Sequence, residues 1–428
     1  PPASPVSRPG ASHAGDGSPA ARALPLAGLR VLDFTAFWAG PAATLLLGSL
    51  GADVIKVEGV TRPDGMRFSA GKPPSEPDWW EWGTMFLATN ANKRGISLEL
   101  GRPEAKPIAR SLVAASDVVI ENFSPRVMAN LGLEWPDVHA ANPAAVMTRM
   151  PAFGLDGPWR DRTGFAQTME QASGMAWMTG EADGPPIIPR GVCDPIAGLH
   201  AVFATLVALV ERERTGEGML VESTMVEAVL NVAAEAAVEY SAYGQVLRRG
   251  GNRGPLAAPQ GAYRCSGDDA WIALAVTDDV QWSALRELLG LPDEPELRTV
   301  SGRRAAHDRI DLALSAWSAR HDRDSAVAAL RAARVPVAPV TPSADLLGNP
   351  QLAARGFFEP VAHAVVGTHP LPGMPFTFAD RTDPWLRLPP PLFGEHNEAV
   401  LGEVLGLSAA EIGALLAAGI VSRRPAGV

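Results

Sequence analysis

Short runs of apolar and β-branched residues alternate with amphipathic helical stretches through the first 150 residues of the chain. A helix is expected at 42–50, started by Gly40-Pro41 and stopped by Gly51, and another at 104–115. The expected strands are residues 29–35, 52–58, 96–100, 117–122 and 145–150. Strands that alternate with helices form a parallel, doubly wound sheet, and such sheets bind ligands beyond the carboxyl ends of their strands.

The sequence pattern changes after a long helical stretch at 225–243. A turn-rich segment at 250–255 leads into two strand-like runs, 261–265 and 271–276, which a Gly-Asp-Asp turn separates as in a hairpin. Helices are expected at 279–289, 304–319 and 325–333, and a last strand at 335–340. This pattern predicts a smaller α+β domain inserted into the chain.

The expected fold class is therefore α/β, with a Rossmann-like parallel-sheet large domain and a smaller α+β domain. We assign 24–228 to the large domain, 229–250 to a linker helix, 251–340 to the small domain and 341–428 to a return segment that completes the large domain. Residues 1–23 are rich in Pro, Ala, Ser and Gly and lack the apolar segment of a signal peptide, so we expect a disordered leader there.

Composition and charge argue against several classes of function. With 428 residues, of which 46% are hydrophobic, the chain can bury a large core. The net charge of −10 without a Lys/Arg run argues against nucleic-acid or membrane binding. Cys193 and Cys265 are the only cysteines, so a reducing, cytoplasmic location is expected, and metal-ligand spacings are absent. The longest apolar helix, 195–210, is interrupted by Gly198 and His200 and is interpreted as a core helix rather than a membrane span.

The first strand–helix turn excludes a dinucleotide cofactor. Residues 37–42 read Phe-Trp-Ala-Gly-Pro-Ala, without the glycine spacing of a pyrophosphate-binding loop. The indole of Trp38 would obstruct a pyrophosphate at this position, which argues against NAD and FAD.

Asp194 is the leading candidate for chemistry. It precedes Pro195 and the apolar helix, the usual arrangement of a helix N-cap. Most Asp-Pro pairs at a helix start are caps and nothing more. The helix dipole and free backbone N–H groups would also stabilise an ionised carboxylate, which can act as a nucleophile in a partly dry cleft.

The sequence segments around Asp194 indicate a role beyond helix capping. Several segments, in this order, resemble the class III CoA-transferases of the CaiB/BaiF type, which include formyl-CoA and carnitine CoA-transferases and, by fold, the α-methylacyl-CoA racemases. The resemblance extends over about residues 25 to 421. The segments that carry it are 33–41, 51–58, Asn92-Lys-Arg94, 121–125, Phe153-Gly154, 164–174, 178–186, Asp194, 211–218 and Gly394-Glu-His-Asn397.

The resemblance implies that Asp194 attacks an acyl-CoA thioester and carries the acyl group and then CoA, with CoA as a substrate and no tightly bound cofactor. It also implies an interlocked homodimer with sites between subunits. The positions that match the family's CoA cleft are Phe37, Trp38, Ala39, Leu98, Leu100, Asn122 and Phe123, and the candidate phosphate partners are Arg62, Arg94 and Arg102. Without the resemblance, the apolar members are equally well ordinary core, and each Arg is more readily a solvated surface charge.

Three departures from the family pattern concern the substrate pocket. Trp38 replaces a Gln, and Phe165-Ala166 replaces the Tyr-Glu pair of transferases or the His-Asp pair of racemases. The family's glycine-rich substrate loop is present as residues 254–260, with Ala258 and Gln260 as candidate pocket residues. Together these departures favour a bulky or apolar acyl group, which Trp79, Trp80 and Trp82 could also line, although a packing role suits them equally.

Two alternatives remain open. A racemase would need two opposed acid–base residues, and the missing His at position 165 removes one of them; His200 lies off the helix face of Asp194. A CoA-binding partner subunit without turnover is the second alternative, and an α/β enzyme of other chemistry is the generic one.

Overall fold

The centre of the molecule is a six-stranded parallel sheet. The computed structural model describes residues 23–69, 71–379 and 383–428, and the expected leader lies almost entirely outside them. The strand order is β3-β2-β1-β4-β5-β6, and every neighbouring pair is parallel. The strands are β1 (Arg30–Asp33), β2 (Asp53–Glu58), β3 (Lys93–Ser97), β4 (Val118–Glu121), β5 (Val146–Arg149) and β6 (Leu220–Glu222). The doubly wound sheet is thus confirmed, with β6 added at one edge.

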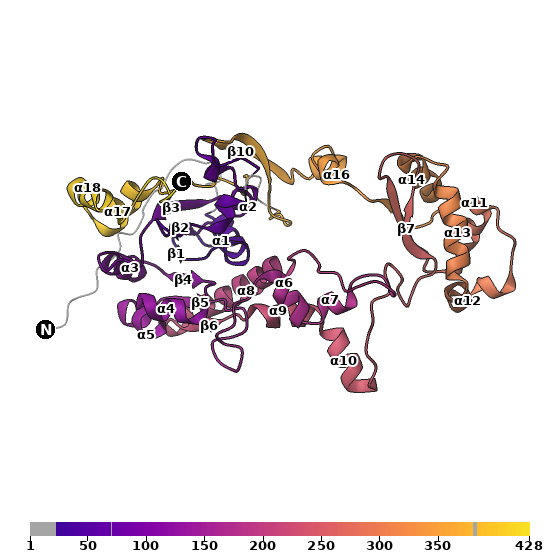
Figure 1. Cartoon of the computed structure of the whole chain (residues 1–428), viewed down its shortest axis with the longest axis horizontal. Coiled ribbons are helices and arrows are strands. Elements are labelled where there is room, and N and C mark those ends of the chain that lie inside the picture. Colours follow the sequence, from indigo (N-terminus) through magenta and orange to yellow (C-terminus); the bar gives the residue numbers. More distant parts are fainter. Residues whose placement is uncertain (1–22, 70, 380–382) are drawn as a thin grey trace.

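Two hydrophobic clusters cover the two faces of this sheet. Successive strand residues point to opposite faces, so Val31 contributes to one cluster and Leu32 to the other. The first face packs against α1 (Ala39–Ser49), α6 (Ala166–Ala172), α8 (Cys193–Thr215) and α9 (Met225–Val232). The second packs against α3 (Ala105–Ala114), α4 (Pro125–Leu131), α5 (Trp135–Ala141), α17 (Asn397–Leu405) and α18 (Ala409–Ala417). Figure 1 shows the sheet between these helices.

Helix α8 is longer than the sequence pattern indicated. Among the described residues it is the one helix long and apolar enough, by length and composition, to cross a membrane. Its contacts are those of a core helix, because Ala197, Ala201 and Ala208 pack into the first cluster. The side of α8 that bears Leu199 and Phe203 is exposed.

The small lobe has a core of its own. Its antiparallel sheet pairs β7 (Gln260–Arg264), β8 (Trp271–Ala275) and β9 (Val337–Pro339). Its helices are α11 (Asp279–Leu289), α12 (Val300–Ala305), α13 (His307–Ser318) and α14 (Arg323–Ala332). Figure 1 shows this lobe apart from the parallel sheet, joined to it by two extended connections. The two-lobe α/β fold class is confirmed.

The return segment is fastened to the large lobe by two asparagines. The Oδ1 of Asn92 accepts hydrogen bonds from the backbone N–H groups of Arg387 and Leu388. The Oδ1 of Asn397 accepts from the N–H of Ser97 on β3. The chain returns through α15 (Ser343–Leu346), α16 (Pro350–Ala354) and the hairpin β10 (Phe358–His363) and β11 (Gly367–Pro372). Thus two of the segments that carry the family resemblance close the large lobe.

The remaining short elements connect these parts. Helix α10 has no buried residue and follows α9 directly, in place of the single long helix expected there. The elements are η1 (Gly65–Phe68), η2 (Trp79–Trp82), α2 (Thr84–Thr89), α7 (Met175–Met178), α10 (Ala234–Tyr243) and η3 (Pro295–Arg298).

Candidate active site

The strand order reverses between β1 and β4, and the loops that follow these two strands frame the candidate site. Helices lead away from these strands on opposite faces of the sheet, which leaves a crevice at their carboxyl ends. The Asn122 side chain spans it: its Nδ2 donates to the Ala36 carbonyl at 2.8 Å, and its Oδ1 accepts from the Ala36 N–H at 2.9 Å. This reciprocal pair fixes the floor of the crevice.

A cavity of about 220 Å³ opens at this point. Asp194 and Arg162 are the charged residues of its lining. The rest of the wall is largely apolar and comes from five separate stretches of the chain. These residues are Ala36, Phe37, Asn122, Phe123, Ser124, Pro125, Val127, Ala152, Thr163, Gly164, Phe165, Met169 and Met225. One acid and one cation therefore face a mainly apolar space.

Asp194 lies in the first turn of α8, two residues past the N-cap position that was expected for it. The helix begins at Cys193 and its N-cap is Val192, so the N-cap assignment for Asp194 was wrong. The turn before it has left-handed backbone at Arg190 (φ 71°) and Gly191 (φ 93°). At Gly191 a Cβ would come within 3.2 Å of the Trp38 ring, so glycine permits both the backbone conformation and the close contact.

The buried Glu170 occupies the donors expected to stabilise Asp194. Its carboxylate accepts from the N–H groups of Gly191 at 3.2 Å and Cys193 at 3.1 Å. Burial, and then the negative charge of Glu170, raise the pKa of Asp194 to about 7. The expected stabilisation of ionised Asp194 by the helix dipole is therefore outweighed, and its carboxylate is more basic than an ordinary aspartate.

Neighbouring groups are less suited to nucleophilic or acid–base chemistry. Burial, together with the charges of Asp194 and Glu170, raises the pKa of the Cys193 thiol to about 12, so the thiol remains protonated. The ring of His200 bonds the carbonyl of Ile196 on its own helix, and no histidine lines this cavity.

A buried ion pair holds Phe37 in the wall of the cavity. Phe37 has left-handed backbone (φ 68°), and its N–H donates to Asp64 Oδ1 at 3.0 Å. Asp64 Oδ2 in turn accepts from Lys56 Nζ at 2.9 Å, and Lys56 also donates to the Thr35 carbonyl. The ring of Phe37 meets that of Phe165 edge to face, with centroids 5.3 Å apart.

A second cavity, of about 490 Å³, adjoins the first across Ala36, Phe123 and Val127, which line both. It lies beyond β1, β2 and β3, and the predicted residues Arg62 and Leu100 line it. Arg62 is the only cation of its lining. Together the two cavities form one crevice along the carboxyl edge of the sheet.

Several predicted cleft residues lie just behind these walls. Trp38 packs on Gly191, and Ala166 is buried at the start of α6. Ala39 is buried where α1 meets α8, and Leu98 is part of the core on the second face of the sheet. None of the four lines either cavity.

Arg94 and Arg102 differ from Arg62 in their partners. Arg94 lies near the amino end of β3 and forms ion pairs with Asp53 and Glu403, at the edge of the sheet opposite the crevice. This position corrects its assignment as a phosphate partner. Arg102 is exposed beside the crevice and pairs with Glu104.

The other predicted pocket residues are elsewhere. Ala258 is fully buried in the small lobe, and Gln260 begins β7; neither lines the Asp194 cavity within one chain. Trp79, Trp80 and Trp82 form η2 and do not line it either.

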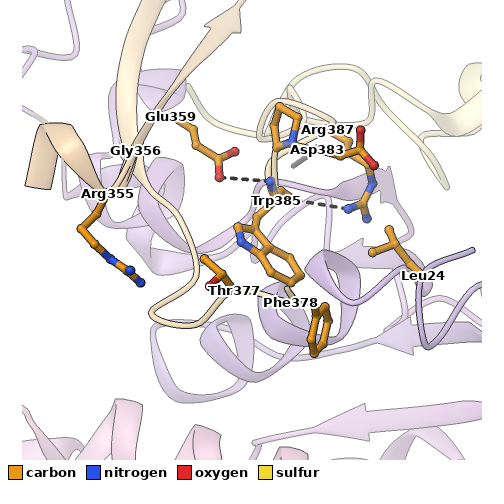
Figure 2. A pocket seen from close by; sticks show the side chains of 10 residues that line it. Leu24, Arg355, Gly356, Glu359, Thr377, Phe378, Asp383, Trp385 and Arg387 are labelled. Carbon is orange, nitrogen blue, oxygen red and sulfur yellow. Dashed lines mark hydrogen bonds between the residues drawn. The ribbon is translucent and has the colours of Figure 1, made fainter. Parts of the chain in front are cut away.

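A further cavity, of about 580 Å³, is separate from Asp194. It lies along the return segment, where Glu359 accepts from the N–H of Trp385 and Arg387 donates to the Trp385 carbonyl (Figure 2). These side chains already hold the return segment together, so the cavity shows no chemistry of its own.

Comparison with known proteins identifies the family to which the chain belongs. The model of CoA-transferase family III matches residues 26–397. The chain belongs to this family. It is 33% identical over 418 residues to the succinyl-CoA–L-malate CoA-transferase alpha subunit of Chloroflexus aurantiacus, covering 96% of this chain and 94% of that protein. It is 31% identical to the formyl-CoA:oxalate CoA-transferase of Streptomyces avermitilis, covering 92% and 99%.

Among solved structures, a CaiB/BaiF family protein from Brucella suis superposes with a TM-score of 0.81 at 31% identity. The match covers 90% of this chain and all of that one. The expected family, fold class and enzyme class, a CoA-transferase, are thereby confirmed.

The sequence interpretation missed three residues of the site. Glu170 stands in a helix four residues after the Phe165-Ala166 pair, and no local pattern marks it as buried beside Asp194. Asp64 and Arg162 lie in loops, where periodicity carries no information.

Proposed function

We propose that this family III enzyme moves CoA from an acyl-CoA to a carboxylic acid, with Asp194 as the covalent carrier. The observation that carries the proposal is the position of Asp194. It is the only acid in the lining of a largely apolar cavity, at the point where the sheet order reverses, and its pKa is raised to about 7. A carboxylate with this pKa is ionised to a useful extent near neutral pH and is a better nucleophile than an ordinary aspartate.

The reaction proceeds by four acyl transfers. A carboxylate oxygen of Asp194 attacks the thioester carbonyl, the C–S bond breaks, and CoA leaves as thiolate from a mixed anhydride. The thiolate then attacks the aspartyl carbonyl and releases the donor acid as carboxylate, which leaves an aspartyl-CoA thioester. The acceptor carboxylate displaces the thiolate to form a second anhydride, and the thiolate takes the new acyl group and frees Asp194. No net proton is transferred, and the energy of the thioester is conserved in each intermediate.

The adjoining cavity of about 490 Å³ suits the CoA moiety. Arg62, which lines this cavity, is the expected partner of a CoA phosphate. Leu100 and Phe123 supply apolar wall, and the Asn122–Ala36 pair lies between the two cavities. Arg102 at the margin is a second candidate for a phosphate. CoA enters as substrate and leaves as product, so no tightly bound cofactor is required.

The acyl group occupies the cavity at Asp194. Phe37, Phe165, Met169 and Met225 offer it an apolar surface, which supports a group with a substantial hydrocarbon part. The named relatives act on malate and oxalate, which are small and polar acids. We expect any difference in acyl-group preference between this chain and those relatives to arise from these wall residues.

A second copy of the chain is expected to cover the exposed face of α8. Leu199, Phe203, Val207 and Val210 follow one another on this face with 53% to 70% of each side chain exposed. Helix α10, with no buried residue, extends the unpartnered region. A dimer would bury this surface and could bring the 254–260 loop of one chain, with Ala258 and Gln260, to the site of the other.

We expect the enzyme to act in the cytoplasm.

Trapping of the intermediate tests the proposal. Incubation with succinyl-CoA and then hydroxylamine should convert Asp194 to the hydroxamate, which peptide mass spectrometry detects. Asp194→Asn should abolish both labelling and transfer while CoA binding persists. Asp183→Asn, in the exposed segment before α8, is the matched control and should label normally. Transfer at wild-type rate by Asp194→Asn would overturn the proposal.

A further inference from the structure

The charges around Asp194 present a problem for a carboxylic acid substrate. Asp194 lines the cavity, and Glu170, which is completely buried outside the lining, adds a second negative charge close to Asp194. An additional carboxylate there is repelled unless a cation offsets it. Arg162 is the only cation in the lining.

Arg162 is oriented by an aromatic ring rather than by an acid. Its guanidinium lies over the Trp159 ring, 4.5 Å from the centroid, and Trp159 in turn meets Phe153 edge to face at 5.5 Å. The Arg162 N–H donates to the Trp159 carbonyl, which fixes the turn. In the described ranges, no side-chain hydrogen bond or ion pair joins this guanidinium to another residue. A stacked guanidinium keeps its N–H edge available to an oxyanion.

The two charged residues also differ in depth. Asp194 is half-buried at the start of α8, whereas Arg162 is exposed on a loop at the rim. Both residues line the same cavity, so an acyl group whose reacting carbonyl is held at Asp194 can extend along the apolar wall toward Arg162. This arrangement suits an acid with a second, unreacted carboxylate.

We propose that Arg162 binds the distal carboxylate of the acyl group, so that the enzyme selects dicarboxylic acids over monocarboxylic acids of the same length. The inference rests on the proposed function. The distal carboxylate takes no part in bond making; it is held by the guanidinium through two parallel hydrogen bonds while the other carboxyl group is transferred. The apolar wall between Arg162 and Asp194 contacts the methylene chain.

The experiment compares four CoA esters in two matched pairs: succinyl-CoA with butyryl-CoA, and glutaryl-CoA with pentanoyl-CoA. The rate of Asp194 hydroxamate formation is measured for each with the full chain. The wild type should react faster with the dicarboxylic member of at least one pair by on the order of 10- to 100-fold, the range expected for a charge-assisted bidentate contact.

Arg162→Met should remove that preference, because its rate with the dicarboxylic ester falls far more than its rate with the monocarboxylic ester. Arg162→Lys should retain part of the preference, because it keeps the charge but loses the planar fork. Arg160→Met, two residues away and outside the cavity lining, should behave as wild type. The monocarboxylic ester serves as the internal check that the Arg162→Met variant is folded.

Two results would overturn the inference alone: equal rates within both pairs in the wild type, or an undiminished preference in Arg162→Met. A different result, no hydroxamate from any of the four esters in the wild type, would overturn the proposed function and this inference with it.

Discussion

Glu170 holds the turn that presents Asp194, and its charge opposes the ionisation of Asp194. The carboxylate of Glu170 accepts the N–H of Cys193, the residue directly before Asp194, and that of Gly191. It thereby uses the donors at the start of α8 that would otherwise stabilise the Asp194 anion. One buried side chain thus both fixes the position of the carrier and keeps it basic.

The first prediction concerns Glu170→Gln. Removal of the charge lowers the pKa of Asp194, so the acid limb of kcat/KM moves to lower pH. Because burial is the larger cause of the raised pKa, the limb should remain above the ordinary aspartate range. The amide can accept only one of the two backbone N–H groups well, so the maximal rate should fall about 10-fold, as expected for about 1–2 kcal/mol.

The pH profile separates these two effects of Glu170. A profile unchanged in shape but lower in height would indicate that Glu170 acts only through the turn. Glu227→Gln, on the exposed side of α9, is the control and should alter neither the position of the acid limb nor the maximal rate.

The second prediction is the pH dependence of the wild type. Asp194 must be ionised to attack, and burial with the charge of Glu170 raises its pKa to about 7. Activity should therefore fall as the pH drops below about 7, tenfold per pH unit at the limit, when kcat/KM is measured with saturating acceptor. A level profile down to pH 5 would contradict Asp194 as the nucleophile with this pKa.

The third prediction concerns stability. The pKa of Asp194 is higher in the folded chain than in the unfolded chain, so the penalty of its ionisation is absent at pH 3.5 and grows as the pH rises to about 7. Asp194→Asn should thus stabilise the protein at pH 8 by about 1–3 kcal/mol, because solvent screens the charge of a carboxylate that is only partly buried. Denaturant unfolding at pH 8 and pH 5 measures the effect, and the gain must be smaller at pH 5.

Sequence pattern predicted the strands beside the site and failed where polar residues are buried. The alternating apolar runs at β1, β2, β4 and β5 face two hydrophobic clusters, so periodicity located them. The start of β3 was missed because Lys93 and Arg94 are polar. Lys93 is completely buried, and its Nζ is bonded to the nearby Asn90 and to Pro41 and Asp33, which come from distant parts of the chain.

The same limit applies to the site. Asp194 was identified from the motifs around it, but its pKa depends on Glu170, which only the packing of α6 against α8 brings near. The motifs at Asn92 and Asn397 that supported the resemblance fasten the return segment and touch no cavity of the site. Motif order therefore identified the family, whereas the polarity of the pocket required the three-dimensional arrangement.

The fourth prediction concerns the contact between α8 and α1. At Gly198, one turn after Asp194, a Cβ would lie 2.7 Å from the Ala39 carbonyl oxygen. Gly198→Ala should therefore destabilise the protein by about 1–3 kcal/mol and lower activity, because α8 must move away from α1. Gly413→Ala in α18, where a Cβ meets nothing within 4 Å, should instead stabilise by up to about 1 kcal/mol. Thermal unfolding of both variants distinguishes a steric contact from helix propensity, and equal stabilisation of both would refute the close packing.

The last prediction concerns the exposed face of α8. Phe203 is 70% exposed at the middle of the apolar stripe, so Phe203→Glu should abolish self-association by placing a charge in the proposed interface. Light scattering after size exclusion should give a dimer for the wild type and a monomer for the variant. Val280→Glu, at an 80% exposed position of α11, should remain dimeric.

If the wild type is a monomer that becomes a dimer only with a homologous second chain, the partner is a second, homologous subunit, as the alpha and beta names of two Chloroflexus relatives indicate for those proteins. In that case Phe203→Glu should block pairing with that chain instead, because the apolar stripe requires cover whichever subunit supplies it.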